Sequence, residues 1–101
     1  MELYKIISSK LADESYQDNI DYLEESWTII EITNFIKKVE EVITILKVEP
    51  KTFKKYHLNK EIHQIVILKQ ITLFYQIKNK SVELLLFFNN HQGPKKIEKL
   101  L

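Results

Sequence analysis

The sequence predicts an α+β protein: an N-terminal strand, a helical hairpin, a three-stranded antiparallel meander forming one sheet, and a short C-terminal helix. Three observations predict this class. Apolar residues recur at helical spacing before residue 50, and the period changes to two after residue 60. A Thr-x-x-Glu motif at Thr28–Glu31 is typical of a helix start. Pro50 prevents the second helix from continuing.

The first strand is predicted over residues 3–7, which are short and β-prone. Ser8 and Ser9 follow, and either can cap the helix predicted over residues 9–24. Steps of four, four, three and four residues place five apolar side chains on one face of this helix. They are Ala12, Tyr16, Ile20, Leu23 and Trp27.

The second helix is predicted over about residues 28–47. Thr28 and Glu31 fit a reciprocal capping box, and Trp27 and Ile32 fit the accompanying hydrophobic staple. The buried stripe of this helix is predicted to contain Ile32, Phe35, Ile36, Val39, Ile43 and Leu46.

A polar, basic connection is predicted over residues 51–60, before three strands that are rich in β-branched and aromatic residues. Turns are expected at residues 69–70 and 78–80. The last strand is apolar on both faces, which favours an internal position in the sheet. Pro94 suits the first position of a short helix over residues 95–101. The three strands are predicted over residues 62–68, 71–77 and 82–88.

The 101 residues are predicted to form one domain spanning residues 1–101, because this length holds one core. Hydrophobic residues make up 45% of the chain and charged residues 29%, which favours a globular protein over a disordered one. The first residues lack the basic start and apolar run of a secretory signal, and no apolar stretch is long enough to span a bilayer. The expected location is therefore the cytoplasm, without a membrane partner.

Missing residue types exclude several chemistries. The chain has no cysteine, which excludes disulfides, thiol nucleophiles and cysteine-ligated metals. Its single glycine, Gly93, cannot supply a phosphate-binding P-loop or a dinucleotide fingerprint. His57 and His63 have no carboxylate pair at a metal-ligand spacing. We therefore expect neither a metal nor a cofactor.

Charge is distributed unevenly along the chain. Residues 1–49 carry five lysines and eleven carboxylates, a net charge of −6, whereas residues 50–101 carry ten lysines and three carboxylates, a net charge of +7. All fifteen basic residues are lysines. The split predicts an acidic face and a basic face, with the basic one attracting an anionic partner. Two solvated faces that merely differ in sign are the alternative interpretation.

Four segments, in this order and spacing, resemble the RelE/ParE family of toxins from bacterial type II toxin–antitoxin systems, and in particular its ParE-like subgroup. Residues 4–8 followed by Ala12 resemble the family's opening strand and helix start. Residues 20–23 followed by Trp27 resemble the end of its first helix. Residues 71–77 resemble its third strand, with the usual aromatic–tyrosine pair, and residues 84–94 resemble the ParE-like ending before Pro94.

The resemblance implies a toxin, of the kind that stabilises plasmids, that a co-encoded antitoxin neutralises. Homodimers and toxin–antitoxin hetero-oligomers are both compatible with it. RelE-like members are ribosome-dependent endoribonucleases that cut messenger RNA, whereas ParE-like members lack that catalytic set and poison DNA gyrase. We expect a ParE-like toxin that acts by binding a large target such as gyrase. The alternatives are a RelE-type ribonuclease and a degenerate family member without toxicity.

The positions that usually hold arginine in ParE-like proteins correspond here to His63, Gln76 and His91. RNA cleavage without a metal needs acid–base groups and a cation that stabilises the phosphorane charge. If the chain is a nuclease, the candidate catalytic residues are therefore His91, Lys69 and His63. An ordinary turn residue is the alternative interpretation of His91.

Lys54, Lys55 and Lys60 are the candidate phosphate contacts for an anionic partner. Phe53 and Tyr56 alternate with two of these lysines, a pattern that suits base stacking. Packing of both rings beneath a loop is the alternative.

Overall fold

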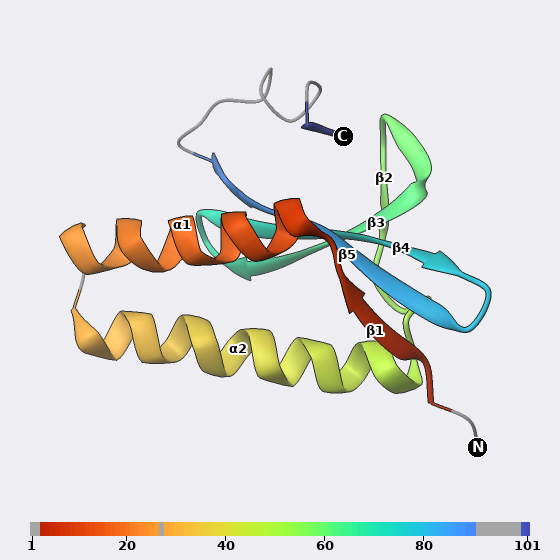
Figure 1. Ribbon diagram of the computed structural model, residues 1–101, viewed down its shortest axis with the longest axis horizontal. Coiled ribbons are helices and arrows are strands. Elements are labelled where there is room, and N and C mark those ends of the chain that lie inside the picture. The colour runs from red at the N-terminus through yellow and green to blue at the C-terminus, as the bar shows by residue number, and fades with distance from the viewer. Residues whose placement is uncertain (1–2, 27, 91–99) are drawn as a thin grey trace.

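The computed structural model describes residues 3–26, 28–90 and 100–101. In this part of the chain the elements are β1 (Lys5–Ser8), α1 (Lys10–Ser26), α2 (Ile29–Val48), β2 (Lys55–Tyr56), β3 (Asn59–Leu68), β4 (Ile71–Lys78) and β5 (Ser81–Asn89). They form a five-stranded sheet in the order β1-β5-β4-β3-β2, with α2 packed against one face and α1 beside β5 (Figure 1).

The predicted class is confirmed. β3, β4 and β5 form the expected antiparallel meander, and β1 joins it by pairing in parallel with β5. The prediction of an irregular connection over residues 51–60 is wrong in its second half, because β2 and the start of β3 lie there and pair as a hairpin. This strand of two residues is too short to produce a recognisable period in the sequence.

Both predicted helix starts are confirmed. The Ser9 hydroxyl accepts a hydrogen bond from the Ala12 N–H at 3.0 Å, so it caps α1. The Glu31 N–H donates to the Thr28 hydroxyl, and the Glu31 carboxylate accepts from the Thr28 N–H, which completes the capping box of α2. The predicted staple cannot be described, since Trp27 lies outside the described residues.

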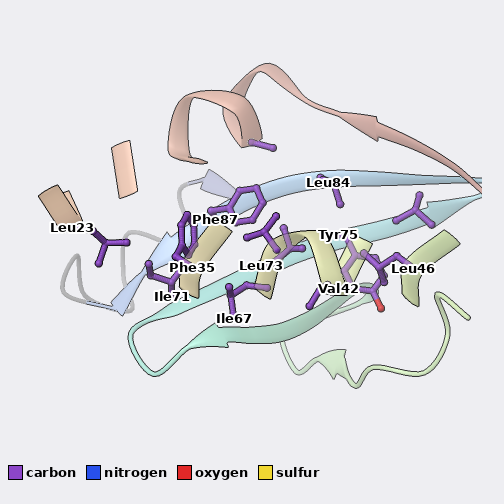
Figure 2. Packing of buried hydrophobic residues seen from close by; sticks show 13 residues of the cluster. Leu23, Phe35, Val42, Leu46, Ile67, Ile71, Leu73, Tyr75, Leu84 and Phe87 are labelled. Carbon is purple, nitrogen blue, oxygen red and sulfur yellow. The ribbon is translucent and has the colours of Figure 1, made fainter. Parts of the chain in front are cut away.

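The main core lies between the helices and the sheet. Figure 2 shows side chains from both helices and from β3, β4 and β5 gathered in this cluster. Phe35, Val39 and Leu46 are buried as predicted, and Val42 joins them on the same face of α2. On α1, Ala12 and Leu23 are fully buried.

A bulge changes which side chains of β5 face the main core. Tyr75 pairs with Leu84 and Phe74 pairs with Leu86, which leaves Leu85 as an extra residue. Val82 and Leu84 therefore belong to the main core, whereas Leu86 and Phe88 belong to a second buried cluster. β5 lies between β1 and β4, as its composition predicted.

Beyond the bulge, α1 takes the place of a neighbouring strand. β1 pairs only with residues 81–84 of β5. Further along, the Phe87 N–H donates to the Ser15 hydroxyl at 2.9 Å, and the Asn19 amide donates to the Phe87 carbonyl at 2.9 Å. Asn89 donates to the Asn19 side-chain oxygen at 3.2 Å. Two polar side chains of the helix thus satisfy a buried strand edge.

The second cluster consists of Tyr56, Ile62, Phe74, Leu86 and Phe88, with Leu100 and Leu101 packed against it. Most of the predicted C-terminal helix, residues 95–99, lies outside the described part of the chain. Neither α1 nor α2 is long and apolar enough to cross a membrane.

Candidate anion-binding site

A pocket of about 670 Å³ lies at the end of the sheet where β3 begins and β4 ends. Its walls come from the connection after α2, from β2, and from the adjoining ends of β3 and β4. The lining residues are Lys51, Lys55, Lys60, Glu61, His63, Gln76, Ile77 and Lys78.

Strand pairing brings these residues together. Lys55 of β2 pairs with His63 of β3, and Ile62 pairs with Gln76 of β4. Continuing the β3–β4 register by two residues sets Lys60 opposite Lys78. The turn between β4 and β5 forms at the predicted place, and Asn79 there adopts a left-handed φ of 54° that asparagine tolerates better than most residues.

The pocket is strongly basic. Four lysines and one carboxylate line it. Among the described residues, no carboxylate forms an ion pair within 4.0 Å with any of these four lysines. An anionic group entering the pocket would meet several ammonium groups, each a mobile point charge without the fixed fork of arginine.

His63 supports one wall of the pocket. Its side chain is buried, and Nδ1 lies 2.9 Å from the Phe53 carbonyl oxygen. A carbonyl only accepts, so Nδ1 carries the proton of this hydrogen bond. The imidazole stacks on Tyr75, whose hydroxyl donates to the Pro50 carbonyl at 2.7 Å. The two hydrogen bonds hold the chain on both sides of Lys51.

Gln76 is also held in place, because its amide donates to the Glu83 carboxylate at 2.7 Å across β4 and β5. The structure thus brings two of the three expected arginine positions, His63 and Gln76, to one pocket. The third, His91, lies outside the described residues.

Other predicted site residues lie elsewhere. Lys69 is in the turn between β3 and β4, six residues from His63 along an extended strand, or roughly 20 Å away. Lys54 is exposed and does not line the pocket, although its carbonyl accepts from the Gln64 N–H at 2.9 Å. Of the three predicted phosphate contacts, the pocket therefore contains Lys55 and Lys60.

The aromatic residues beside these lysines are packed. Tyr56 is buried in the second cluster, with its ring 5.2 Å from that of Phe74. Phe53 packs against the main core. The packing interpretation of this pair is therefore confirmed.

Lys51 and Lys78 were not predicted as site residues. A signal for Lys78 exists: counting back from the short turn at residues 69–70 places it near the start of β3. No comparable signal exists for Lys51, which reaches the pocket through the non-local contacts of the Pro50–Phe53 segment.

No protein-family model matches the chain, and no curated protein matches it. Solved structures do match. A chain of the chromosomal ParDE toxin–antitoxin system from P. aeruginosa aligns with a TM-score of 0.70 and 9% identity, covering 85% of this chain and 95% of that one. The YoeB dimer from Staphylococcus aureus aligns with a TM-score of 0.61 and 13% identity, covering 84% of this chain and 94% of that one. The YoeB/ParE toxin from Agrobacterium tumefaciens aligns with a TM-score of 0.61 and 10% identity, covering 84% of this chain and 96% of that one. The chain thus has the RelE/ParE-type toxin fold.

Proposed function

We propose that this protein is the toxin of a bacterial type II toxin–antitoxin system, acting in the cytoplasm on a large target such as DNA gyrase and neutralised by a cognate antitoxin. The carrying observation is that its fold matches chains from toxin systems over 94–96% of their length. Each alignment therefore covers nearly the whole of the matched chain. Residues 1–101 would act as one domain.

The geometry of the pocket supports binding rather than RNA cleavage. Metal-independent cleavage needs an acid and a base on either side of a phosphate. His63 is buried and its Nδ1 is engaged by a backbone carbonyl, while Lys69 lies at the other end of β3. The described part of the chain therefore does not group the predicted catalytic residues around one position.

A RelE-type ribonuclease is the second candidate. It is favoured by the four lysines in one pocket, since a messenger RNA backbone would supply the anions that they attract. His91 would then be the general acid. This candidate predicts that His91→Ala abolishes both message cleavage and growth arrest, whereas a gyrase-binding toxin predicts no message cleavage and a growth arrest that His91→Ala leaves unchanged.

The test is to induce the chain alone in a bacterial host and to follow growth, DNA supercoiling and translation separately. Growth arrest with loss of supercoiling supports the proposal. Arrest with cleavage of ribosome-bound message transfers the function to the second candidate. Normal growth at verified protein levels overturns both and leaves a degenerate, non-toxic member.

The proposed antitoxin partner has its own test. A short reading frame next to the gene is expected to encode a protein that restores growth on co-expression. Size-exclusion chromatography with light scattering then gives the stoichiometry, which distinguishes a toxin homodimer from a toxin–antitoxin hetero-oligomer. Failure of the neighbouring product to bind would contradict its assignment as antitoxin.

A further inference from the structure

A second hollow lies at the opposite edge of the sheet from the basic pocket, between β1, α1 and α2. This groove has a volume of about 310 Å³. Most of its lining is apolar, and it contains two carboxylates and no lysine. The lining residues are Ile6, Ser8, Asp13, Tyr16, Val39, Glu40, Ile43, Leu84 and Phe87.

The floor of the groove is fixed by packing. Val39, Leu84 and Phe87 are buried in the main core. The Tyr16 ring lies 5.4 Å from Phe35 in a stacked arrangement and 5.3 Å from Phe87 edge-on. An incoming side chain would therefore meet a preformed apolar surface and would not have to order it.

The rim of the groove is negative. Asp13 lies in the first turn of α1 and accepts a hydrogen bond from Ser8, and both side chains are exposed. Glu40 is exposed on α2. The pKa of Tyr16 is raised, chiefly by the burial of its own ring and secondly by the negative charge of Glu40, so this carboxylate lies close enough to influence a side chain of the groove. α1 as a whole carries six carboxylates against one lysine, Lys10, which pairs with Glu14 at 3.8 Å.

We infer that this groove docks a basic amphipathic protein segment, whose aliphatic side chains cover the floor while lysine or arginine side chains lie beside Asp13 and Glu40. Charge complementarity selects the partner, because an acidic segment would place like charges on the rim. The same carboxylates disfavour an anionic membrane surface. The inference rests on this groove and not on the proposed toxicity.

The probe is a fluorescently labelled helical peptide with a leucine face and a lysine face. A second peptide keeps the leucine face and replaces every lysine by glutamate. Fluorescence anisotropy with the full chain is expected to show saturable binding of the lysine peptide, weakened by added salt, and no binding of the glutamate peptide. Equal binding of both peptides, or no binding of the lysine peptide, would overturn the inference.

Matched variants locate the site. Asp13→Asn with Glu40→Gln is expected to weaken binding of the lysine peptide about three- to tenfold, the effect of two exposed ion pairs. Asp18→Asn with Glu41→Gln removes the same charge from the same two helices but outside the groove, and is expected to change binding less than about twofold. Equal effects of the two pairs would show attraction to the net charge alone and refute the groove.

Ile43→Ala tests the apolar part of the groove, since this side chain is only half-buried. It is expected to weaken peptide binding while the circular dichroism spectrum stays unchanged. A second copy of the chain is the competing occupant. Concentration-dependent dimerisation that Asp13→Asn with Glu40→Gln abolishes would assign the groove to self-association and overturn the inference.

Discussion

The imidazole of His63 lies parallel to the phenol ring of Tyr75, with ring centroids 5.2 Å apart and an interplanar angle of 14°. Each ring also makes a hydrogen bond to the connection after α2, at Phe53 and Pro50 respectively. Lys51 lies between these two anchor points. A buried aromatic pair therefore determines where one wall of the basic pocket stands.

Tyr75→Phe tests the first anchor. The ring stays, but the Pro50 carbonyl loses its buried donor, so we expect the free energy of unfolding to fall by about 1–2 kcal/mol. Urea denaturation measures this change. Tyr4→Phe, at a half-buried position with no side-chain hydrogen bond to a described residue, is the control and should change stability by less than about 0.5 kcal/mol. Equal losses in the two variants would show that the Pro50 contact contributes nothing.

Alkaline pH tests the same hydroxyl. Burial raises the pKa of Tyr75 well above its ordinary value of 10.0. Above pH 10 the unfolded chain therefore releases this proton while the folded chain retains it, and stability falls as pH rises. The stability difference between the parent and Tyr75→Phe should narrow between pH 9 and pH 11. A constant difference would contradict the raised pKa, since lysine titration is common to both proteins.

Asn19→Ala tests the seam between α1 and β5. The Asn19 amide donates to the Ser15 and Phe87 carbonyls, and its oxygen accepts from Asn89. Because the buried Phe87 carbonyl loses this donor and the polar contact between α1 and β5 is broken, we expect a loss of about 2–3 kcal/mol in urea denaturation. Gln17→Ala removes an exposed side chain of the same helix and should change stability by less than about 0.5 kcal/mol. Similar values for both variants would refute the seam.

Neutralising the pocket tests its affinity for anions. Lys55→Gln with Lys60→Gln is expected to weaken binding of a short single-stranded RNA and to flatten the salt dependence of its affinity, because fewer counterions are released. Lys54→Gln with Lys69→Gln removes the same charge outside the pocket and serves as the control. Filter binding at several salt concentrations measures both. If the two pairs of substitutions weaken RNA binding equally, the affinity depends on the net charge of the protein alone and the pocket makes no specific contribution.

The order and limits of the main elements were predictable because their signals are local. The Thr28–Glu31 capping box, the stop at Pro50 and the change of period each report on hydrogen bonds or packing within a few residues. The predicted strands at 62–68, 71–77 and 82–88 differ from β3, β4 and β5 by at most three residues at an end. A two-residue strand such as β2 carries no such signal.

The site was predictable only in part. Lys55 and Lys60 were singled out as phosphate contacts, and His63 and Gln76 as positions of expected arginines, but the sequence did not predict that the four line one pocket. No pattern within one segment predicts that Lys51 joins them or that Lys69 does not. Those facts depend on strand register and on hydrogen bonds between residues ten and twenty-five positions apart.

The sequence by itself determined an α+β chain with an acidic first half, a basic second half and no cysteine or arginine. Only the tertiary structure decided where those charges lie. Four lysines line a pocket at one end of the sheet, and two carboxylates line an apolar groove at the opposite edge. Ser15 and Asn19 would be unfavourable on the buried face of an isolated helix. In the folded chain both form hydrogen bonds to the backbone of Phe87. The physical reason is that the cost of burying a polar group depends on whether it finds a hydrogen-bond partner, and here the partner is about seventy residues away in the sequence.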